Sequence, residues 1–221
     1  MEEKKVRIIS AKGEMTRQRI LETSKKLFYE RGYKDVSMRN IAQQCNIAGG
    51  NLTYYFATKQ EVADCILTDF YLAIMKYVRD YFPEMDRVFD RHFYNSMIFN
   101  IVLFRNENYM RFYREILDSQ RPMEIFSKIV EHVYLGIMDE FHLRITQIQY
   151  KFILIADSGQ RRESFITLYD EKMNIPPKDY SLMVYEITSR LFGVPYKEFV
   201  RSAYDSYRKV DDMFTEQFKL L

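Results

Sequence analysis

The sequence predicts an all-α protein, and three observations support this prediction. Apolar side chains recur at three- and four-residue steps along most of the 221 residues, which is the period of a helix with one buried face. No segment shows the convincing alternation of apolar and polar residues that is typical of a strand. All five prolines fall between the periodic stretches, where they separate one helix from the next.

The first amphipathic helix is expected over residues 16–31. Apolar residues lie there at helical spacing, with charged residues between them. Gly32 follows directly, and glycine often ends a helix because it enters the left-handed region without strain. The expected apolar face consists of Ile20, Leu21, Leu27 and Phe28.

Residues 37–59, SMRNIAQQCNIAGGNLTYYFATK, predict two short helices joined by a tight turn. Ser37 is expected to cap the first of them. Asn46 makes the turn, because asparagine is second only to glycine in adopting the left-handed conformation that the turn needs. Ile47 and Leu52 then hold the second helix against the first. This is the layout of a helix-turn-helix, whose second helix reads DNA.

The outward groups of this segment are the candidate DNA-binding residues. Arg39 and Asn51 are expected to specify bases, since arginine can pair with guanine and asparagine with adenine in the major groove. The other candidates are Ser37, Tyr54, Tyr55 and Lys59 for phosphates, Thr53 for a thymine methyl or a phosphate, and Gly49 and Gly50 for close approach of the backbone. Two alternatives stay open: the glycines are tolerated without contact, or Tyr54 packs against the next helix.

A long helix is expected to begin at Lys59. Thr58 and Glu61 have capping-box spacing, in which Thr58 accepts from the backbone near Glu61 and Glu61 reaches back to the Thr58 amide. Lys59 then lies beside a helix N-terminus, where a cation and backbone N–H groups can hold a phosphate. Helices are expected over residues 59–82, 87–105, 109–119, 122–142, 146–172, 179–192 and 196–218.

Residues 16–67 resemble the DNA-binding domain of the TetR/AcrR family of bacterial transcriptional regulators. The segments ILETSKKLFYERGY, VSMRNIAQQCNI and NLTYYF, and the K-x-E at the start of the long helix, carry this resemblance. It implies an N-terminal arm and a three-helix helix-turn-helix domain over residues 1–58. A larger helical domain for effector binding and dimerisation would follow over residues 59–221.

The sequence departs from the family pattern in the recognition helix. Ala48 stands where serine or threonine is frequent, so this helix lacks a side-chain cap, at a cost of about 1 kcal/mol. Gly49 and Gly50 lie in its first turn, each about 1 kcal/mol less favourable than alanine. Thr53 replaces an aromatic residue. We therefore expect the helix to be loosely ordered without DNA.

The charge is distributed unevenly along the chain. Residues 1–60 carry twelve Lys or Arg against six Asp or Glu, a net charge of +6, and the remainder carries 21 against 25, a net charge of −4. This suits a protein that offers its first part to a polyanion, although ordinary surface charge is the alternative. Residues 1–14 are basic and contain no secretory h-region, and either an arm for an adjacent minor groove or a disordered terminus is expected there. No stretch is long and apolar enough for a membrane span. A cytoplasmic protein is expected.

Tyrosine and phenylalanine number 18 and 17, so aromatic residues are unusually dense. The family resemblance implies an effector pocket between the middle helices, although aromatic residues at helical spacing can equally form plain core. The candidate pocket residues are Phe99, Phe104, Tyr109, Phe112, Tyr113, Phe126, Tyr134 and Phe152.

No catalytic site, metal site or cofactor is expected. The three histidines are scattered, and none has a second ligand at the helical spacing of a metal site. Cys45 and Cys65 do not make a disulfide framework or a zinc site. No nucleophile, base and orienting group come together in the sequence, so an enzyme is not expected.

The sequence therefore predicts a homodimeric regulator that binds double-stranded operator DNA with an approximate palindrome. Most members of the family it resembles are repressors, and release by an unknown small-molecule effector is expected. The C-terminal helices over residues 146–172 and 179–218 are the candidates for the dimer interface. The alternative is a DNA-binding adaptor controlled by a protein partner, with no small-molecule pocket.

Overall fold

A computed structural model of the protein describes residues 11–119, 124–211 and 215–221, which form helices and connecting loops without any strand. This confirms the all-α prediction. The helices are α1 (Ala11–Arg31), α2 (Met38–Gln44), α3 (Gly49–Tyr55), α4 (Lys59–Tyr81), α5 (Val88–Phe104), α6 (Glu107–Leu117), α7 (Glu124–Glu140), α8 (Gln147–Asp170), α9 (Pro177–Phe192) and α10 (Tyr196–Lys209).

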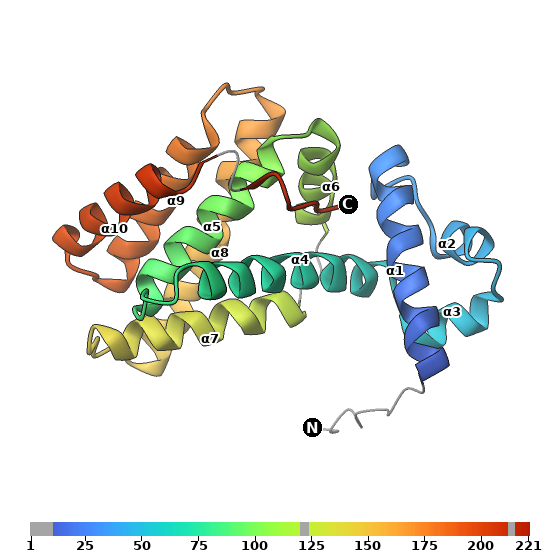
Figure 1. The fold of residues 1–221 in the computed structure, drawn as a ribbon, viewed down its shortest axis with the longest axis horizontal. Helices are drawn as coiled ribbons and strands as arrows, with labels where there is room; N and C mark the ends of the chain where they lie inside the picture. The colour runs from blue at the N-terminus through green and yellow to red at the C-terminus, as the bar shows by residue number, and fades with distance from the viewer. Residues whose placement is uncertain (1–10, 120–123, 212–214) are drawn as a thin grey trace.

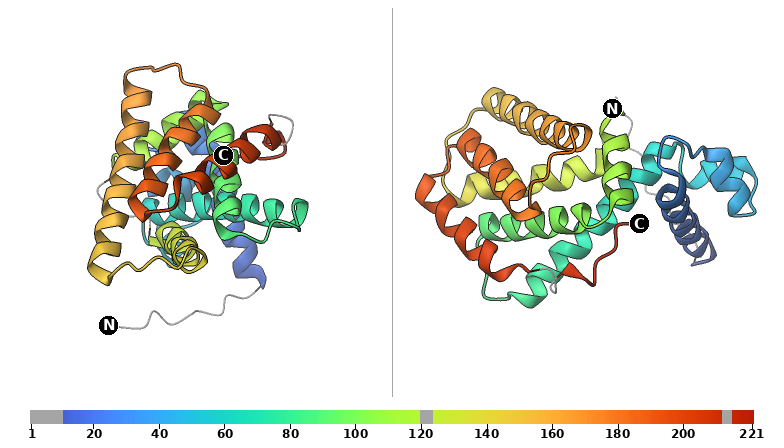
Figure 2. Two further views of the ribbon diagram at one scale, coloured as in Figure 1. Left: turned by 90° about the vertical axis from the view of Figure 1, so that its left-hand side faces the viewer. Right: turned by 90° about the horizontal axis from the view of Figure 1, so that it is seen from above.

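The helices form a small head and a larger body (Figure 1). Helices α1, α2 and α3 make up the head at one end of the molecule, and α4 runs from the head into the body. Within the body α5 packs against α4, α7 and α9, and α7 lies along α4. Helix α8 lies on the outer side of the body, packed against α9 and α6 (Figure 2).

The local signals in the head act as the sequence predicts. Gly32 ends α1 with a φ of 87° and its N–H donates to Phe28 O at 2.9 Å. Ser37 caps α2, and its Oγ accepts from the N–H of Asn40 at 3.2 Å. Asn46 occupies the turn between α2 and α3 with a φ of 51°. These three residues therefore fix how α1, α2 and α3 follow one another.

The N-terminus of α4 shows one difference from the expected capping box. Thr58 Oγ1 accepts from the N–H of Glu61 at 3.1 Å, as predicted. Glu61 Oε2, however, accepts from the N–H of Ala57 at 2.7 Å rather than from that of Thr58. The carboxylate thus caps the residue before the N-cap, and both bonds still satisfy N–H groups at the start of the helix.

Two predicted helix boundaries differ from the structure by five residues or more. Helix α1 begins at Ala11 rather than at residue 16, and α10 ends at Lys209 rather than at residue 218. Val210 and Leu220 are fully buried, so the chain leaves α10 to return to the core. The free energy gained from this apolar burial outweighs the helical periodicity. The end of α10 could not be read from the sequence, because no proline or glycine marks it.

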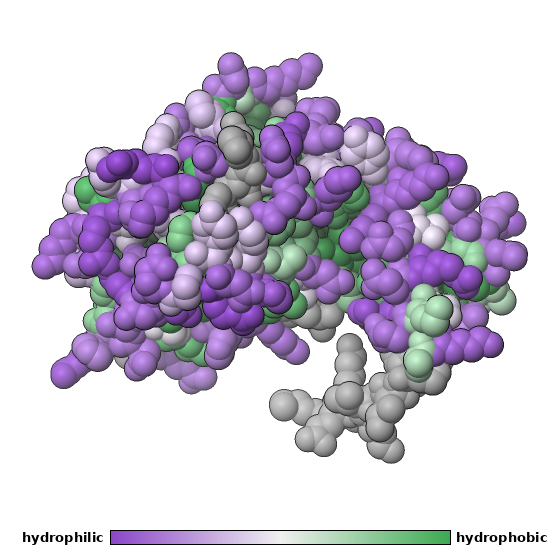
Figure 3. All heavy atoms as spheres, viewed as in Figure 1, coloured by the Kyte–Doolittle hydropathy of each residue, from purple (hydrophilic) through white to green (hydrophobic). Residues whose placement is uncertain are grey.

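One hydrophobic cluster joins the head to the body. It contains Ile20, Phe28 and Leu52 of the head together with Ile66 of α4 and Phe112 of α6. A second cluster fills the far end of the body. The face in Figure 3 is mainly hydrophilic, and hydrophobic residues show where the head meets the body. Within the described ranges, no helix combines the length and the apolar character that a membrane span needs.

Candidate nucleic-acid interface and internal cavity

Helix α3 presents most of its residues to solvent. Leu52 is its one buried side chain and packs into the core beneath it. The side of α3 that faces away from the head therefore consists of exposed residues, and those predicted for DNA binding are Gly49, Gly50, Asn51, Thr53 and Tyr54. At the other end of the helix Tyr55 is half-buried against the core.

The first turn of α3 is uncapped and unobstructed. Ala48 provides no side-chain hydrogen bond as the N-cap residue. A Cβ atom added at Gly49 or at Gly50 would meet no heavy atom within 4 Å. Nothing in the protein itself therefore requires glycine at either position, and the first turn offers bare backbone to whatever lies outside it.

Two further side chains of α3 have partners within the helix. Thr53 Oγ1 donates to Gly50 O at 3.1 Å, so its hydroxyl proton is used and its methyl group remains available. Tyr54 is 54% exposed and its ring meets that of Tyr55 edge-on, with 5.1 Å between the centroids. The ring of Tyr54 is thus supported on one side and open to solvent on the other.

Helix α2 contributes a second row of polar groups. Arg39 is exposed and lines a hollow between α2 and α3, and Gln43 and Thr53 line it as well. Gln43 is not among the residues predicted from the sequence. Its position four residues after Arg39 puts both side chains on one face of α2, and this spacing could have identified it. A glutamine amide can read adenine as an asparagine amide does.

The predicted phosphate ligands Ser37 and Lys59 already have protein partners. Ser37 Oγ lies 2.6 Å from Asn40 Oδ1 and donates to it. Lys59 Nζ donates to Tyr33 O at 2.6 Å and lies 4.2 Å from the centroid of the Tyr33 ring. Burial lowers the pKa of Lys59, whereas Glu115 and Asp35 raise it. Lys59 therefore ties α4 to the loop after α1.

Helix α6 joins the head to the body. Phe112 of α6 stacks on Phe28 of α1 with 5.4 Å between the ring centroids. Arg111 Nη2 donates to Tyr29 O at 2.9 Å. The loop after α1 is held too, because Glu115 Oε2 accepts from the N–H of Lys34 at 2.8 Å. The head is thus attached to α6 by aromatic packing and by charged hydrogen bonds.

The same helix is tied to the outer side of the body. Arg114 donates from Nε and Nη2 to the two carboxylate oxygens of Asp170 at 2.9 and 2.7 Å. This hydrogen bonding to Arg114 lowers the pKa of Asp170 despite an opposing effect of burial. A paired contact of this kind fixes the orientation of both partners, so α6 is held between α1 and the end of α8.

An internal cavity of about 80 Å³ lies beside α6 in the body. Four of the predicted pocket residues line it: Phe99, Tyr113, Phe126 and Tyr134. Tyr113 also contacts the rings of Phe99 and Phe165 edge-on. Because Phe112 points into the head and Tyr113 into the cavity, adjacent residues of α6 contact both.

The other predicted pocket residues lie elsewhere. Phe104 lines a separate surface hollow beside Met110 and Leu168. Tyr109 and Phe112 pack against Tyr29 and Phe28 of the head. Phe152 is 69% exposed on α8, because it falls on the helical face that points away from the body, and its assignment to the pocket is corrected.

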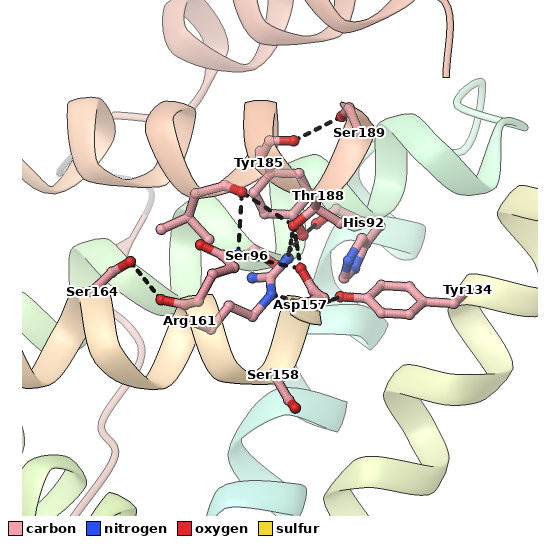
Figure 4. A network of polar contacts seen from close by, with 12 residues as sticks. His92, Ser96, Tyr134, Asp157, Ser158, Arg161, Ser164, Tyr185, Thr188 and Ser189 are labelled. Carbon is pink, nitrogen blue, oxygen red and sulfur yellow. Dashed lines mark hydrogen bonds and ion pairs between the residues drawn. The ribbon is translucent and has the colours of Figure 1, made fainter. Parts of the chain in front are cut away.

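A buried polar network forms one wall of the cavity (Figure 4). Asp157 accepts from Tyr134 Oη at 2.5 Å and from Arg161 Nε at 2.9 Å. Thr188 also donates to this carboxylate, and accepts from Arg161 Nη2 at 2.9 Å. Burial opposes the ionisation of Asp157, but the charge of Arg161 and the hydroxyl donors outweigh it and lower the pKa. The charge of Arg161 is thus compensated inside the protein.

The predicted N-terminal arm lies almost wholly outside the described residues, which begin at residue 11. Residues 11–14 of that segment belong to α1. The candidate DNA-binding groups that the structure describes are therefore those of α2, α3, the N-cap residue of α2 and the start of α4.

The fold and the exposed second helix define a helix-turn-helix protein of the DNA-binding regulator class. Residues 20–65 match the family model of the bacterial regulatory proteins of the tetR family. The probable HTH-type transcriptional regulator YttP of Bacillus subtilis (strain 168) is 26% identical over 157 residues, which cover 69% of each chain. Both matches agree with the resemblance of residues 16–67 to the TetR family of transcriptional regulators.

Solved structures share the fold over most of the chain. The structure of RolR in complex with resorcinol has a TM-score of 0.56 at 16% identity, covering 86% of this chain and 93% of that one. A TetR transcriptional regulator from Rhodococcus sp. RHA1 has a TM-score of 0.55 at 15% identity, covering 80% and 96%. The head and the body together therefore follow an arrangement already seen in solved structures.

Proposed function

We propose that the protein is a homodimeric repressor that binds a palindromic operator through α3 and is released by a small molecule bound in the body. One observation carries the DNA-binding part of this proposal. The outward side of α3 is free of contacts from the rest of the described chain at Gly49 and Gly50, and it is flanked by exposed Arg39 and Asn51. Such a helix can enter a major groove.

Each exposed group has a proposed task at the DNA. Arg39 and Asn51 specify bases, and Gln43 is added to them from its place in the hollow. Tyr54 and Tyr55 set the register on phosphates, and Ser37 and Lys59, which also bind groups of the protein itself, contribute to the same task. Thr53 meets a thymine methyl, because its hydroxyl already donates within the helix. Gly49 and Gly50 allow the backbone to approach closely.

The dimer is proposed to form through α8 and α9. Ile148, Phe152 and Ile155 of α8 are 71%, 69% and 66% exposed. Met183 and Ile187 of α9 are also exposed, and α8 packs directly against α9. Five large apolar side chains on adjacent helices form the kind of surface that a second copy of the chain covers. Two heads would then be held in one molecule.

The effector is proposed to act through α6. The cavity contacts Tyr113, the neighbouring Phe112 packs on the head, and Arg114 ties the helix to α8. A ligand that fits the cavity better in one position of α6 would favour one spacing of the two heads. The solved RolR structure is a complex with resorcinol, a small molecule. This supports control by a small-molecule effector over the alternative of an adaptor controlled by a protein partner. The same proposal includes the division of the chain into a DNA-binding domain over residues 1–58 and an effector-binding and dimerisation domain over residues 59–221.

The DNA-binding proposal is tested by selecting bound fragments from random DNA with the full-length protein. A pseudo-palindrome is expected, and Asn51→Ala should relax the preference at one position in each half-site by about 1–3 kcal/mol. Tyr54→Ala should weaken all sites alike, because a phosphate contact carries no sequence information. Arg208→Ala, in an exposed position on α10, is the matched control and should change neither. A selection that returns no common sequence would overturn the proposal.

A further inference from the structure

A second cavity lies between α4, α5 and α7. Its volume is about 360 Å³, which falls within the range of roughly 300–1,000 Å³ typical of small-molecule sites. The inner cavity beside α6 is smaller, at about 80 Å³. The residues that line the second cavity come from α4, α5 and α7 and include none from α8 or α9. It therefore stays open in the proposed dimer, and we call it the outer cleft.

The outer cleft has an apolar wall. Leu72 and Met75 of α4 face Val133 of α7 across it. Gly136 also lines it, and a Cβ atom there would lie 3.2 Å from Val88 Cγ1. The glycine thus lets α7 approach α5 closely at this end and keeps the wall free of a further side chain. A wall of this composition suits the apolar body of a ligand.

The floor of the outer cleft contains two buried polar atoms without a hydrogen-bond partner among the described residues. They are Nε2 of His92 and Oδ1 of Asn95, in residues that are each 3% exposed. The other ring nitrogen of His92, Nδ1, lies 3.1 Å from Tyr71 Oη. Leaving a buried polar atom unpaired costs about 1–3 kcal/mol. A ligand with a polar group that reached this floor would supply the missing partners.

The rim of the outer cleft is basic. Lys76, Arg79 and Arg91 line it, and none of the described lining residues is acidic. Lys76 and Arg79 share one carboxylate, that of Asp80, and Arg79 Nε lies 3.2 Å from it. Arg91 Nε donates to Met85 O at 2.6 Å, which fixes its guanidinium at the rim. Positive charge therefore exceeds negative charge there, and an anion is attracted.

We propose that the outer cleft binds an organic acid with an apolar body and a hydroxyl or carbonyl group. The carboxylate pairs with Arg79 and its neighbours at the rim, the apolar body lies on the wall of Leu72 and Val133, and the second polar group meets the floor. This site goes beyond the proposed function, which needs only the inner cavity. His92 lines both cavities, so a ligand in the cleft would contact a residue that also lines the inner cavity.

The test measures binding to the free full-length protein by titration calorimetry, with three probes of one chain length. These are 3-hydroxyoctanoate, octanoate, which lacks the hydroxyl, and octanol, which also lacks the charge. The hydroxy acid is expected to bind most tightly and octanol most weakly, with about tenfold between successive probes. Equal affinity for all three probes would overturn the proposal.

Rim variants separate this site from general adsorption. Arg79 has an exposed side chain, so Arg79→Glu should fold normally. It should weaken both acids by about tenfold and leave octanol unchanged. Arg79→Lys should retain binding, and Arg208→Glu on α10 is the charge-matched control outside the cleft. If Arg208→Glu weakened the acids as much as Arg79→Glu, the assignment to the cleft would be wrong.

A second measurement, release of selected operator DNA by 3-hydroxyoctanoate, rests on the proposed function. Binding to the free protein without release would leave the outer cleft established and would refute control of DNA binding through it. If the protein bound no operator even without 3-hydroxyoctanoate, the proposed function would be refuted. The calorimetric ranking of the three probes would still show whether the cleft binds the acids.

Discussion

Gly49 and Gly50 are unusual residues for the first turn of a helix that must be presented rigidly to a partner. Each costs about 1 kcal/mol relative to alanine in a helix, and Ala48 adds no cap to compensate. Because open space surrounds both positions, the fold gives no reason for glycine. A reason outside the chain is close approach of the α3 backbone to DNA.

Replacing both glycines by alanine separates stability from DNA binding. Gly49→Ala with Gly50→Ala is expected to raise the free energy of unfolding by about 1–2 kcal/mol, since alanine favours the helix. The affinity for the selected operator should fall, because two methyl groups would stand between the backbone and the DNA. Urea unfolding and operator titration measure the two effects. A more stable variant with unchanged affinity would contradict the close approach.

His92 makes the stability of the body depend on pH. Burial lowers its pKa to about 3 and the charge of Arg161 adds to this, while Asp157 opposes it. In the unfolded chain the imidazole titrates near its ordinary pKa of about 6.5. Below that pH the unfolded state binds a proton that the folded state does not. The free energy of unfolding should therefore fall from about pH 6.5 towards pH 3, by up to about 1.4 kcal/mol per pH unit.

Two histidine variants test this dependence. His92→Gln should flatten the fall in the free energy of unfolding between pH 6.5 and about pH 4, because no proton is taken up at this position on unfolding. His132→Gln is the matched control, since His132 is exposed. Denaturant titrations at a series of pH values give both slopes. Equal slopes for the wild type and His92→Gln would show that His92 is not the group responsible.

At the scale of helices, the sequence predicts best where a residue has a local conformational reason. Gly32, Ser37 and Asn46 fix the ends of α1 and α2 from their own chemistry, and the structure confirms all three. The end of α10 was wrong because burial of Val210 and Leu220 decides it. Similarly, Phe152 was predicted to line the pocket because the family resemblance implies a pocket among the aromatic residues of the middle helices, whereas only the packing of α8 determines which face is exposed.

The two glycines with positive φ allow helix-end strain to be separated from packing. Gly32 has a φ of 87° and an added Cβ would lie 3.0 Å from Glu115 Oε1. Gly193 has a φ of 76° with nothing near an added Cβ. Gly193→Ala should cost about 1–2 kcal/mol from backbone strain alone. Gly32→Ala should cost more, because the Glu115 carboxylate, which also accepts from the N–H of Lys34, must shift to make room.

Thermal or urea unfolding of the two alanine variants gives this comparison directly. In a Glu115→Ala background, which already lacks the bond to the N–H of Lys34, Gly32→Ala should cost only the backbone strain. Equal costs for the two single variants would show that the contact between Gly32 and Glu115 is easily relieved.

At the scale of the molecule, α4 and α6 connect the head to the body. A single hydrophobic cluster runs through the head, α4 and α6, so the head cannot turn freely. Movement of α6 at Tyr113 must be felt at Phe112 and hence at α1. The sequence could indicate that α4 joins both parts, from its uninterrupted pattern. It could not indicate α6, because the contacts of Phe112 with Phe28 span 84 residues.

The proposed dimer is needed to place two recognition helices on one duplex, and its surface is tested by a charge. Phe152→Glu puts a carboxylate in the centre of the exposed apolar row of α8, where burial against a second copy would be costly. The variant should sediment as a monomer at concentrations where the wild type is a dimer. Leu135→Glu on α7, at 48% exposure, is the matched control and should remain dimeric.

Because Phe152 is exposed in the single chain, the monomer should stay folded but lose operator affinity, since each head then binds its half-site alone. A dimeric Phe152→Glu protein would exclude this face of α8 from the interface and leave α10 to be tested in its place.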